Sequence, residues 1–112
     1  MQYLVTGDYI DPGALLPPDQ LVNMLREVVV PSHDALTNLK SEGKLLAGGY
    51  SVGERAGAFI FEVDSNAELD ALLQGLPFWG LIKFRVTPLE EVEGRRERDR
   101  QQADQIEQTL RR

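Results

Sequence analysis

The order of short β-prone and amphipathic helical segments is the feature of this sequence that most limits its fold. Residues 2–6 are β-prone and stop at a turn rich in Gly, Asp and Pro. Apolar residues at three- and four-residue spacing then predict an amphipathic helix over residues 18–43. Two β-prone runs on either side of the turn 53–55 predict a hairpin. A second helix is predicted to begin after Ser65, and a last alternating strand over 81–87.

These six segments follow one another as β-α-β-β-α-β, the split βαβ arrangement of ferredoxin-like domains. The pattern predicts an α+β fold with a four-stranded antiparallel sheet and both helices on one face. The other face is then too apolar for water, through Ala47, Gly49, Phe59 and Phe61 or the residues that alternate with them. Stacking two such faces in a homodimer would cover them and enclose a cavity.

Local signals refine this outline. Pro31 lies inside the first helix and lacks a backbone N–H, so we expect a kink or two helices that meet near Val30. Ser65 and Glu68 have the spacing of a capping box at the start of the second helix. The pair Gly48-Gly49 predicts a β-bulge or a close approach of backbone or ligand within its strand.

The last part of the chain differs in composition from the rest. Thirteen of the last 24 residues are charged, and no Gly or Pro follows Gly94, which favours a helix. We therefore divide the chain into a domain over 1–89 and a charged helical tail over 90–112. The tail is expected to lie on a partner subunit through Ala103, Ile106 and Leu110, or to be a frayed end.

Composition excludes several classes of function. Eighteen acidic and twelve basic residues give a net charge of −6, which argues against nucleic acid or an anionic membrane as partner. The chain has no cysteine, so disulfides, thiolate metal sites and cysteine nucleophiles are excluded, and a single histidine excludes a two-histidine metal site within one chain. No signal peptide or membrane-spanning run is visible. We expect a soluble cytoplasmic protein with a small-molecule substrate and no metal.

His33 is the first catalytic candidate, because histidine is the residue type that titrates near neutrality. It follows the helix-disrupting Pro31 by two residues and could act as a general acid or base, or simply be a solvated helix residue. Its neighbour Asp34 points about 100° away on a helix, so a partner would have to come from elsewhere in the fold, such as Asp8 or Glu62.

Three charged residues in predicted strands are further candidates. If the alternate residues of the last strand pack under the helices, Lys83 and Arg85 project to the other face, where they could hold a carboxylate or enolate of the substrate. Glu62 is a further catalytic candidate, on a strand expected to be adjacent or nearly so. The alternatives are a cross-strand ion pair with Glu62, or an edge strand kept soluble by charge.

Aromatic residues could wall a flat ligand, although most such residues form core. We select Tyr50, Phe61 and Trp79 as candidate substrate-binding residues, with Trp79 in a turn where it could cap a pocket. Asp8 and Tyr9, at the end of the first strand, could close the mouth of the pocket, or could serve only as turn residues.

Several segments resemble a known family. Leu-Pro-Phe-Trp-Gly at 76–80 and Phe-Arg-Val-Thr-Pro-Leu at 84–89 look like the muconolactone isomerase-like branch of the dimeric α/β-barrel superfamily, and segments 2–7 and 41–49 fit the same pattern. The chain is also similar to the YCII-related proteins of that superfamily. The resemblance covers about residues 1–90.

The resemblance implies a homodimer or higher homo-oligomer with a small-molecule pocket between sheet and helices. It implies a cofactor-independent isomerase or cyclase that works by proton transfer, with His33, Glu62 and Arg85 as catalytic candidates. A non-catalytic ligand-binding or oligomer-assembly protein of the same fold is the alternative, and a haem-binding or oxygen-using member a third possibility. The last strand of this chain carries the basic residues Lys83 and Arg85, where the isomerase carries acidic residues. This difference in charge argues against the isomerase's own lactone as the substrate.

Overall fold

A computed structural model describes residues 1–10 and 16–112 of the chain. Its strands and helices are β1 (Gln2–Tyr9), α1 (Pro18–Met24), α2 (Val30–Ser41), β2 (Leu45–Tyr50), β3 (Ala56–Glu62), α3 (Asn66–Gln74), β4 (Ile82–Leu89) and α4 (Val92–Leu110). A π-helical segment η1 (Leu25–Val29) joins α1 to α2, and a short 3₁₀ turn η2 (Trp79–Leu81) precedes β4. The predicted turn at Asp11-Pro12-Gly13 lies outside the described residues.

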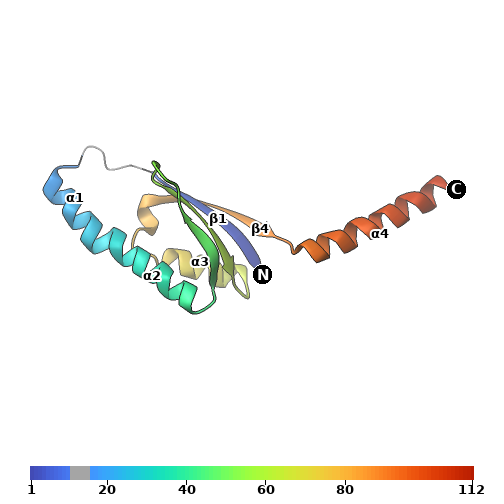
Figure 1. Cartoon of the computed structure of the whole chain (residues 1–112), viewed down its shortest axis with the longest axis horizontal. Helices are drawn as coiled ribbons and strands as arrows, with labels where there is room; N and C mark the ends of the chain where they lie inside the picture. Colours follow the sequence, from blue (N-terminus) through green and yellow to red (C-terminus); the bar gives the residue numbers. More distant parts are fainter. Residues whose placement is uncertain (11–15) are drawn as a thin grey trace.

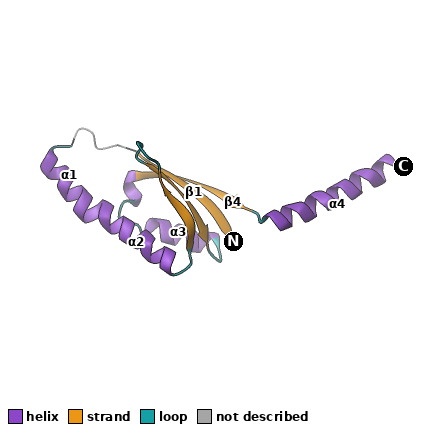
Figure 2. Cartoon of the chain, in the orientation of Figure 1, coloured by secondary structure: helices purple, strands orange, loops and turns teal. Residues whose placement is uncertain are grey.

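The four strands form one antiparallel sheet in the order β2-β3-β1-β4, with α2 and α3 against the same face (Figures 1 and 2). This is the ferredoxin-like α+β arrangement expected from the sequence. Val5 of β1 stands opposite Phe59 of β3 on one side and Val86 of β4 on the other. Each of these three residues therefore belongs to the helix-covered face, since directly opposed residues point the same way.

The core lies between this face and the two helices. Tyr3 and Val5 of β1 and Phe59 and Phe61 of β3 are buried, and they pack in one cluster with Leu36 of α2 and the leucines of α3. Phe59 and Phe61, which we had considered for the uncovered face, belong to the core instead. Their alternates take the uncovered face, because side chains alternate along a strand. We call it the bare face and define it by Leu4, Ala47, Ala58 and Ile60.

The helix predicted over 18–43 is one rod interrupted before Pro31 (Figure 1). In η1 the Val30 amide donates to the carbonyl of Leu25, five residues back, so this turn is wider than an α-helical one. Pro31 then stands in the first turn of α2, where its missing N–H is tolerated. The expected irregularity near Val30 is confirmed, and it takes the form of a π turn.

The predicted hairpin is confirmed as β2 and β3, and the predicted capping residues Ser65 and Glu68 cap the start of α3. The Oγ of Ser65 accepts a hydrogen bond from the Glu68 amide at 3.1 Å, while the Glu68 carboxylate accepts from the Asp64 amide at 3.0 Å, one residue earlier than in a standard capping box. The β-bulge falls between Leu45 and Ala47 rather than at the glycine pair. Gly48 supplies the close approach, because its φ is +136° and a Cβ there would lie 2.3 Å from the Ala58 carbonyl oxygen.

The last strand runs to Leu89, two residues beyond the predicted end at Thr87. Pro88 does not stop it because β4 is an edge strand, where a missing backbone donor on the outer side breaks no ladder bond.

The tail is helical, as predicted, and projects away from the sheet (Figure 1). None of its residues is buried. Ion pairs between residues four apart, Arg95–Asp99 at 3.2 Å and Arg100–Asp104 at 3.1 Å, support it from within. None of the helices in the described ranges is long and apolar enough to span a bilayer.

Candidate functional site

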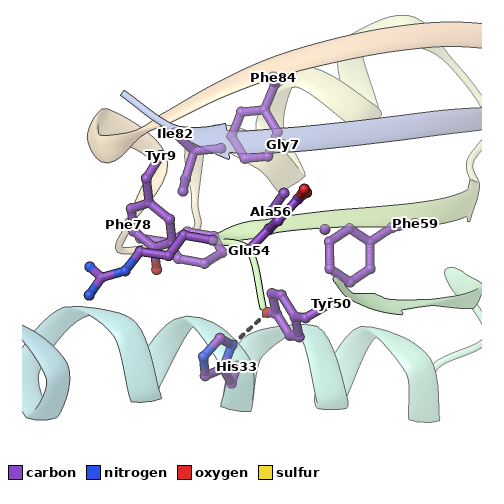
Figure 3. A pocket seen from close by; sticks show the side chains of 12 residues that line it. Gly7, Tyr9, His33, Tyr50, Glu54, Ala56, Phe59, Phe78, Ile82 and Phe84 are labelled. Carbon is purple, nitrogen blue, oxygen red and sulfur yellow. Dashed lines mark hydrogen bonds between the residues drawn. The ribbon is translucent and has the colours of Figure 1, made fainter. Parts of the chain in front are cut away.

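A pocket of about 140 Å³ lies between α2 and the end of the sheet nearest the β2–β3 turn (Figure 3). We call it the inner pocket. Its apolar walls are formed by Phe59, Phe78, Ile82 and Phe84, and its polar groups come from Tyr9, His33, Tyr50, Glu54 and Arg55. A mostly apolar cavity with a few convergent polar groups is the usual form of a small-molecule site.

The floor of the inner pocket is one row of residues across all four strands. Tyr50, Gly57, Gly7 and Phe84 are successive cross-strand partners from β2 to β4, and all four line the pocket. The two central glycines leave a trough between the aromatic ends of the row. A Cβ at Gly57 would lie 2.8 Å from a ring carbon of Phe59, so a side chain cannot be added there without displacing the pocket wall.

His33 and Tyr50 meet at the edge of this trough. The Nδ1 atom of His33, on α2, lies 2.5 Å from the hydroxyl oxygen of Tyr50, the last residue of β2 (Figure 3). Their rings contact edge to face with centroids 4.8 Å apart. The partner of His33 is therefore a residue 17 positions away in the sequence, and neither the adjacent Asp34 nor a strand carboxylate.

Burial changes the acidity of the two tyrosines in the pocket. It raises the pKa of Tyr50 to about 12, and the neighbouring Tyr9 adds to the increase. Burial also raises the pKa of Tyr9, and the positive charge of Arg55 opposes that increase. Tyr50 is thus a neutral phenol at physiological pH, able to donate a hydrogen bond.

Aromatic rings hold the pair in position. Phe78 meets His33 edge to face at 6.1 Å between centroids, and Phe59 meets Tyr50 in the same way at 5.4 Å. Tyr9 contacts the other side of Phe78 at 6.3 Å. Such contacts fix the orientation of the rings. The hydrogen bond itself lies at the exposed edge of the trough, where Tyr50 keeps 49% of its surface exposed.

Ser32 connects α2 to the loop that carries Phe78. It is fully buried, and its Oγ donates to the Val28 carbonyl at 2.7 Å and accepts from the Phe78 amide at 2.9 Å. The sequence contained a signal for this role, since Ser32 occupies a position of the apolar helical stripe where a polar side chain needs a partner. The bond holds His33 and Phe78 in a fixed relation.

Glu62, Lys83 and Arg85 do not line the inner pocket. Lys83 stands opposite Asp8 and Arg85 opposite Thr6, so both project to the bare face, as the alternation predicted. The expected pairing of Glu62 with either of them does not form, because β1 lies between β3 and β4. Glu62 instead pairs with the amino terminus of Met1 at 3.3 Å.

The other predicted substrate-binding residues divide in the same way. Tyr50 lines the inner pocket, whereas Asp8 points to the bare face and Phe61 is buried in the core with 1% of its surface exposed. Trp79 is 47% exposed and is not among the lining residues, while its neighbour Phe78 points inward.

Sequence reasoning passed over Glu54 and Arg55, which it assigned only to the hairpin turn. Both line the inner pocket because the turn lies beside the end of β1, where the Tyr9 amide donates to the Arg55 carbonyl at 3.3 Å. The strand order, with β1 beside β3, places this turn next to the end of β1.

Comparison with solved structures supports the fold. A crystal structure of muconolactone isomerase superposes with a TM-score of 0.68 at 20% identity, over 81% of this chain and 90% of that one. The 5-chloro-2-hydroxyhydroquinone dehydrochlorinase of Burkholderia phenoliruptrix AC1100, solved with 2,5-dihydroxybenzoquinone, gives a TM-score of 0.61 at 21% identity, over 84% of this chain and 98% of that one.

Comparison of sequences identifies the family, whereas the structures support only the fold. The chain is 38% identical over 74 residues to muconolactone delta-isomerase 1 of Acinetobacter lwoffii, a match that covers 66% of this chain and 77% of that protein. It is 36% identical over 89 residues to muconolactone delta-isomerase of Cupriavidus pinatubonensis, over 80% of this chain and 91% of that protein. The family model described as muconolactone delta-isomerase matches residues 1–94. This chain therefore belongs to the muconolactone delta-isomerase family.

Proposed function

We propose that this protein is an isomerase that moves a proton between two carbon atoms of a small unsaturated lactone bound in the inner pocket. The observation that carries the proposal is the hydrogen bond between His33 and Tyr50 at the edge of a largely aromatic pocket. The relatives named muconolactone delta-isomerase support the reaction class.

The pair supplies the two groups that such a reaction needs. With Nδ1–H of His33 donating to the Tyr50 oxygen, Nε2 of His33 carries the lone pair and can remove a proton from a substrate carbon. The C–H bond breaks, an N–H bond forms, and the electron pair moves through the conjugated system to the carbonyl oxygen. The imidazolium then delivers a proton to a different carbon, and atoms and charge balance without a cofactor. Its N–H exchanges with solvent, so deuterium from D₂O can enter the product.

Tyr50 completes the site as a hydrogen-bond donor to the developing enolate oxygen. Because burial raises the pKa of Tyr50 to about 12, the phenol keeps its proton throughout the reaction. A fixed donor in an apolar pocket stabilises negative charge much more than a donor in water does.

The test is turnover of muconolactone and related unsaturated lactones, followed by ultraviolet absorbance and by deuterium incorporation from D₂O. We expect His33→Ala to lower kcat/KM by roughly 10²–10⁴-fold, the usual contribution of a general base. Tyr50→Phe is expected to lower it by about 10²-fold, as for loss of one donor to an oxyanion. The matched control is Lys40→Gln, an exposed change on α2 outside the inner pocket.

Unchanged turnover in His33→Ala and Tyr50→Phe, with the fold intact by circular dichroism, would reject the roles given to the pair. Absence of turnover together with lactone binding would favour a non-catalytic ligand-binding protein of the same fold. Glu62, Lys83 and Arg85 are left out of the proposed catalytic group because they lie outside the inner pocket.

We also propose that the protein is a homodimer formed through the bare face. Two exposed alanines, Ala47 and Ala58, flanked by the partly buried Leu4 and Ile60, allow a second sheet to approach closely. Light scattering should give a dimeric or larger mass, and Ala58→Arg should reduce it. A monomeric mass for the unmodified protein would contradict the proposal.

Two further proposals concern the whole chain. The absence of cysteine supports a cytoplasmic location, where thiols would stay reduced and structural disulfides are rare. The lack of any buried residue in α4 supports the division into a domain over 1–89 and a separate tail over 90–112.

A further inference from the structure

A second hollow adjoins the inner pocket. This outer pocket, of about 290 Å³, is lined among the described residues by Tyr9, Leu21, Met24, Leu25, Val29 and Arg55. Tyr9 and Arg55 line both pockets, so the two hollows share a wall of two residues. The outer pocket has about twice the volume of the inner one, which leaves room for more than a water molecule or two.

The outer pocket exists because the first helical rod extends beyond the end of the sheet (Figure 1). The sheet covers α2, where Leu36 is buried, but no residue of α1 is buried. Leu25, the first residue of η1, keeps 42% of its surface exposed although it is a large aliphatic side chain. Aliphatic side chains gathered around an open hollow beside a ligand pocket are typical of a binding groove.

We propose that the outer pocket is a second subsite of the same binding site and that it holds an alkyl or aryl substituent of the lactone. The inference rests on the proposed function for the position of the lactone ring in the inner pocket. Four aliphatic side chains match an apolar substituent, and Tyr9 and Arg55 stand at the boundary where ring and substituent would join.

The proposal predicts a steep dependence of affinity on substituent length. Each methylene group that enters an apolar pocket strengthens binding by about fourfold. The inner pocket alone, closed by the rings of Phe59, Phe78 and Phe84, would give no such gain once the lactone ring fills it.

Isothermal titration with butenolides that carry a methyl, propyl or pentyl group at the γ-carbon tests this. We expect Kd to fall by about fourfold for each methylene group that enters the outer pocket, up to roughly 250-fold from methyl to pentyl in the unmodified protein. Leu25→Ser should remove most of that gain and leave the methyl compound unaffected. Val22→Ser is the matched control, because Val22 lies on the same rod and is also 42% exposed but does not line the pocket.

Equal Kd values for the methyl and pentyl compounds in the unmodified protein would overturn the proposal, as would equal losses in Leu25→Ser and Val22→Ser. A lower oligomeric mass in Leu25→Ser, with no dependence on length, would assign the outer pocket to contact with a second copy and would also overturn it. The length dependence without any turnover would retain the subsite and reject the proposed reaction. Normal turnover with no dependence of Kd on substituent length would retain the proposed reaction and reject the subsite.

Discussion

Replacing Ser32 by alanine tests whether a single buried hydroxyl positions the site. In the native fold the Ser32 side chain is fully buried and its Oγ bridges the Val28 carbonyl and the Phe78 amide. Alanine is a better helix former than serine, so a loss of stability in this variant would come from the missing bridge and not from the helix itself. The Phe78 amide would then lie buried without the acceptor that Ser32 supplies.

The cost follows from the desolvated amide. A buried donor that loses its partner destabilises a protein by about 1–3 kcal/mol, and we take about 2 kcal/mol for this site. For a domain of this size that corresponds to a fall in Tm of roughly 10 °C. Because the same bond fixes Phe78 against the ring of His33, we also expect kcat/KM for lactone turnover to fall more than the folded fraction alone explains.

Denaturant unfolding followed by circular dichroism measures the change. Ser41→Ala is the matched control, since Ser41 lies on the same helix and its Oγ donates to the Thr37 carbonyl in an exposed setting. We expect that variant to stay within about 0.5 kcal/mol of the unmodified protein. Equal stabilities of Ser32→Ala and Ser41→Ala would refute the argument that the buried bridge holds the site.

Three other predictions follow from the same structure. Gly48→Ala should destabilise the protein by about 2–4 kcal/mol in chemical denaturation, because Gly48 has a φ of +136° and the new Cβ would meet the Ala58 carbonyl. The control Gly49→Ala, whose Cβ would have no atom within 4 Å, should lower the free energy of unfolding by about 1 kcal/mol or less. Since the pKa of Tyr50 is raised from 10.0 to about 12, the folded state holds the phenol proton more tightly than the unfolded state does. The stability that this group contributes is therefore present below pH 10 and is lost as the pH rises toward 12. In unfolding experiments over that pH range, the free energy of unfolding of Tyr50→Phe should fall less steeply than that of the unmodified protein. Deleting residues 90–112 should leave the Tm of the remaining domain unchanged within about 2 °C, because α4 buries none of its residues; a fall of 5 °C or more would show that the tail supports the domain.

Periodicity determined much of the fold without tertiary information. The alternation of Ile82, Phe84 and Val86 with Lys83 and Arg85 separated the two faces of β4 correctly, because side chains alternate along any strand. Pro31 predicted an irregular helix because proline has no backbone N–H to donate. Such features depend only on residues within a few positions of one another.

The site depended on contacts between distant segments. His33 was identified as a candidate from its residue type, but its partner Tyr50 follows from the packing of α2 over the last residue of β2. A cross-strand ion pair between Glu62 and Arg85 was one interpretation of the sequence, and the strand order excludes it because β1 lies between β3 and β4.

What the sequence by itself determined about this protein is the kind and order of its elements, since hydrogen-bonding and hydrophobic periods are local properties. What only the tertiary structure decided is the row Tyr50-Gly57-Gly7-Phe84, which forms the pocket floor from four different strands. The physical reason is register: a shift by two residues in any strand pair would leave every side chain on its own face, so alternation permits it, yet it would bring different residues into this row. The packing of distant segments selects the register.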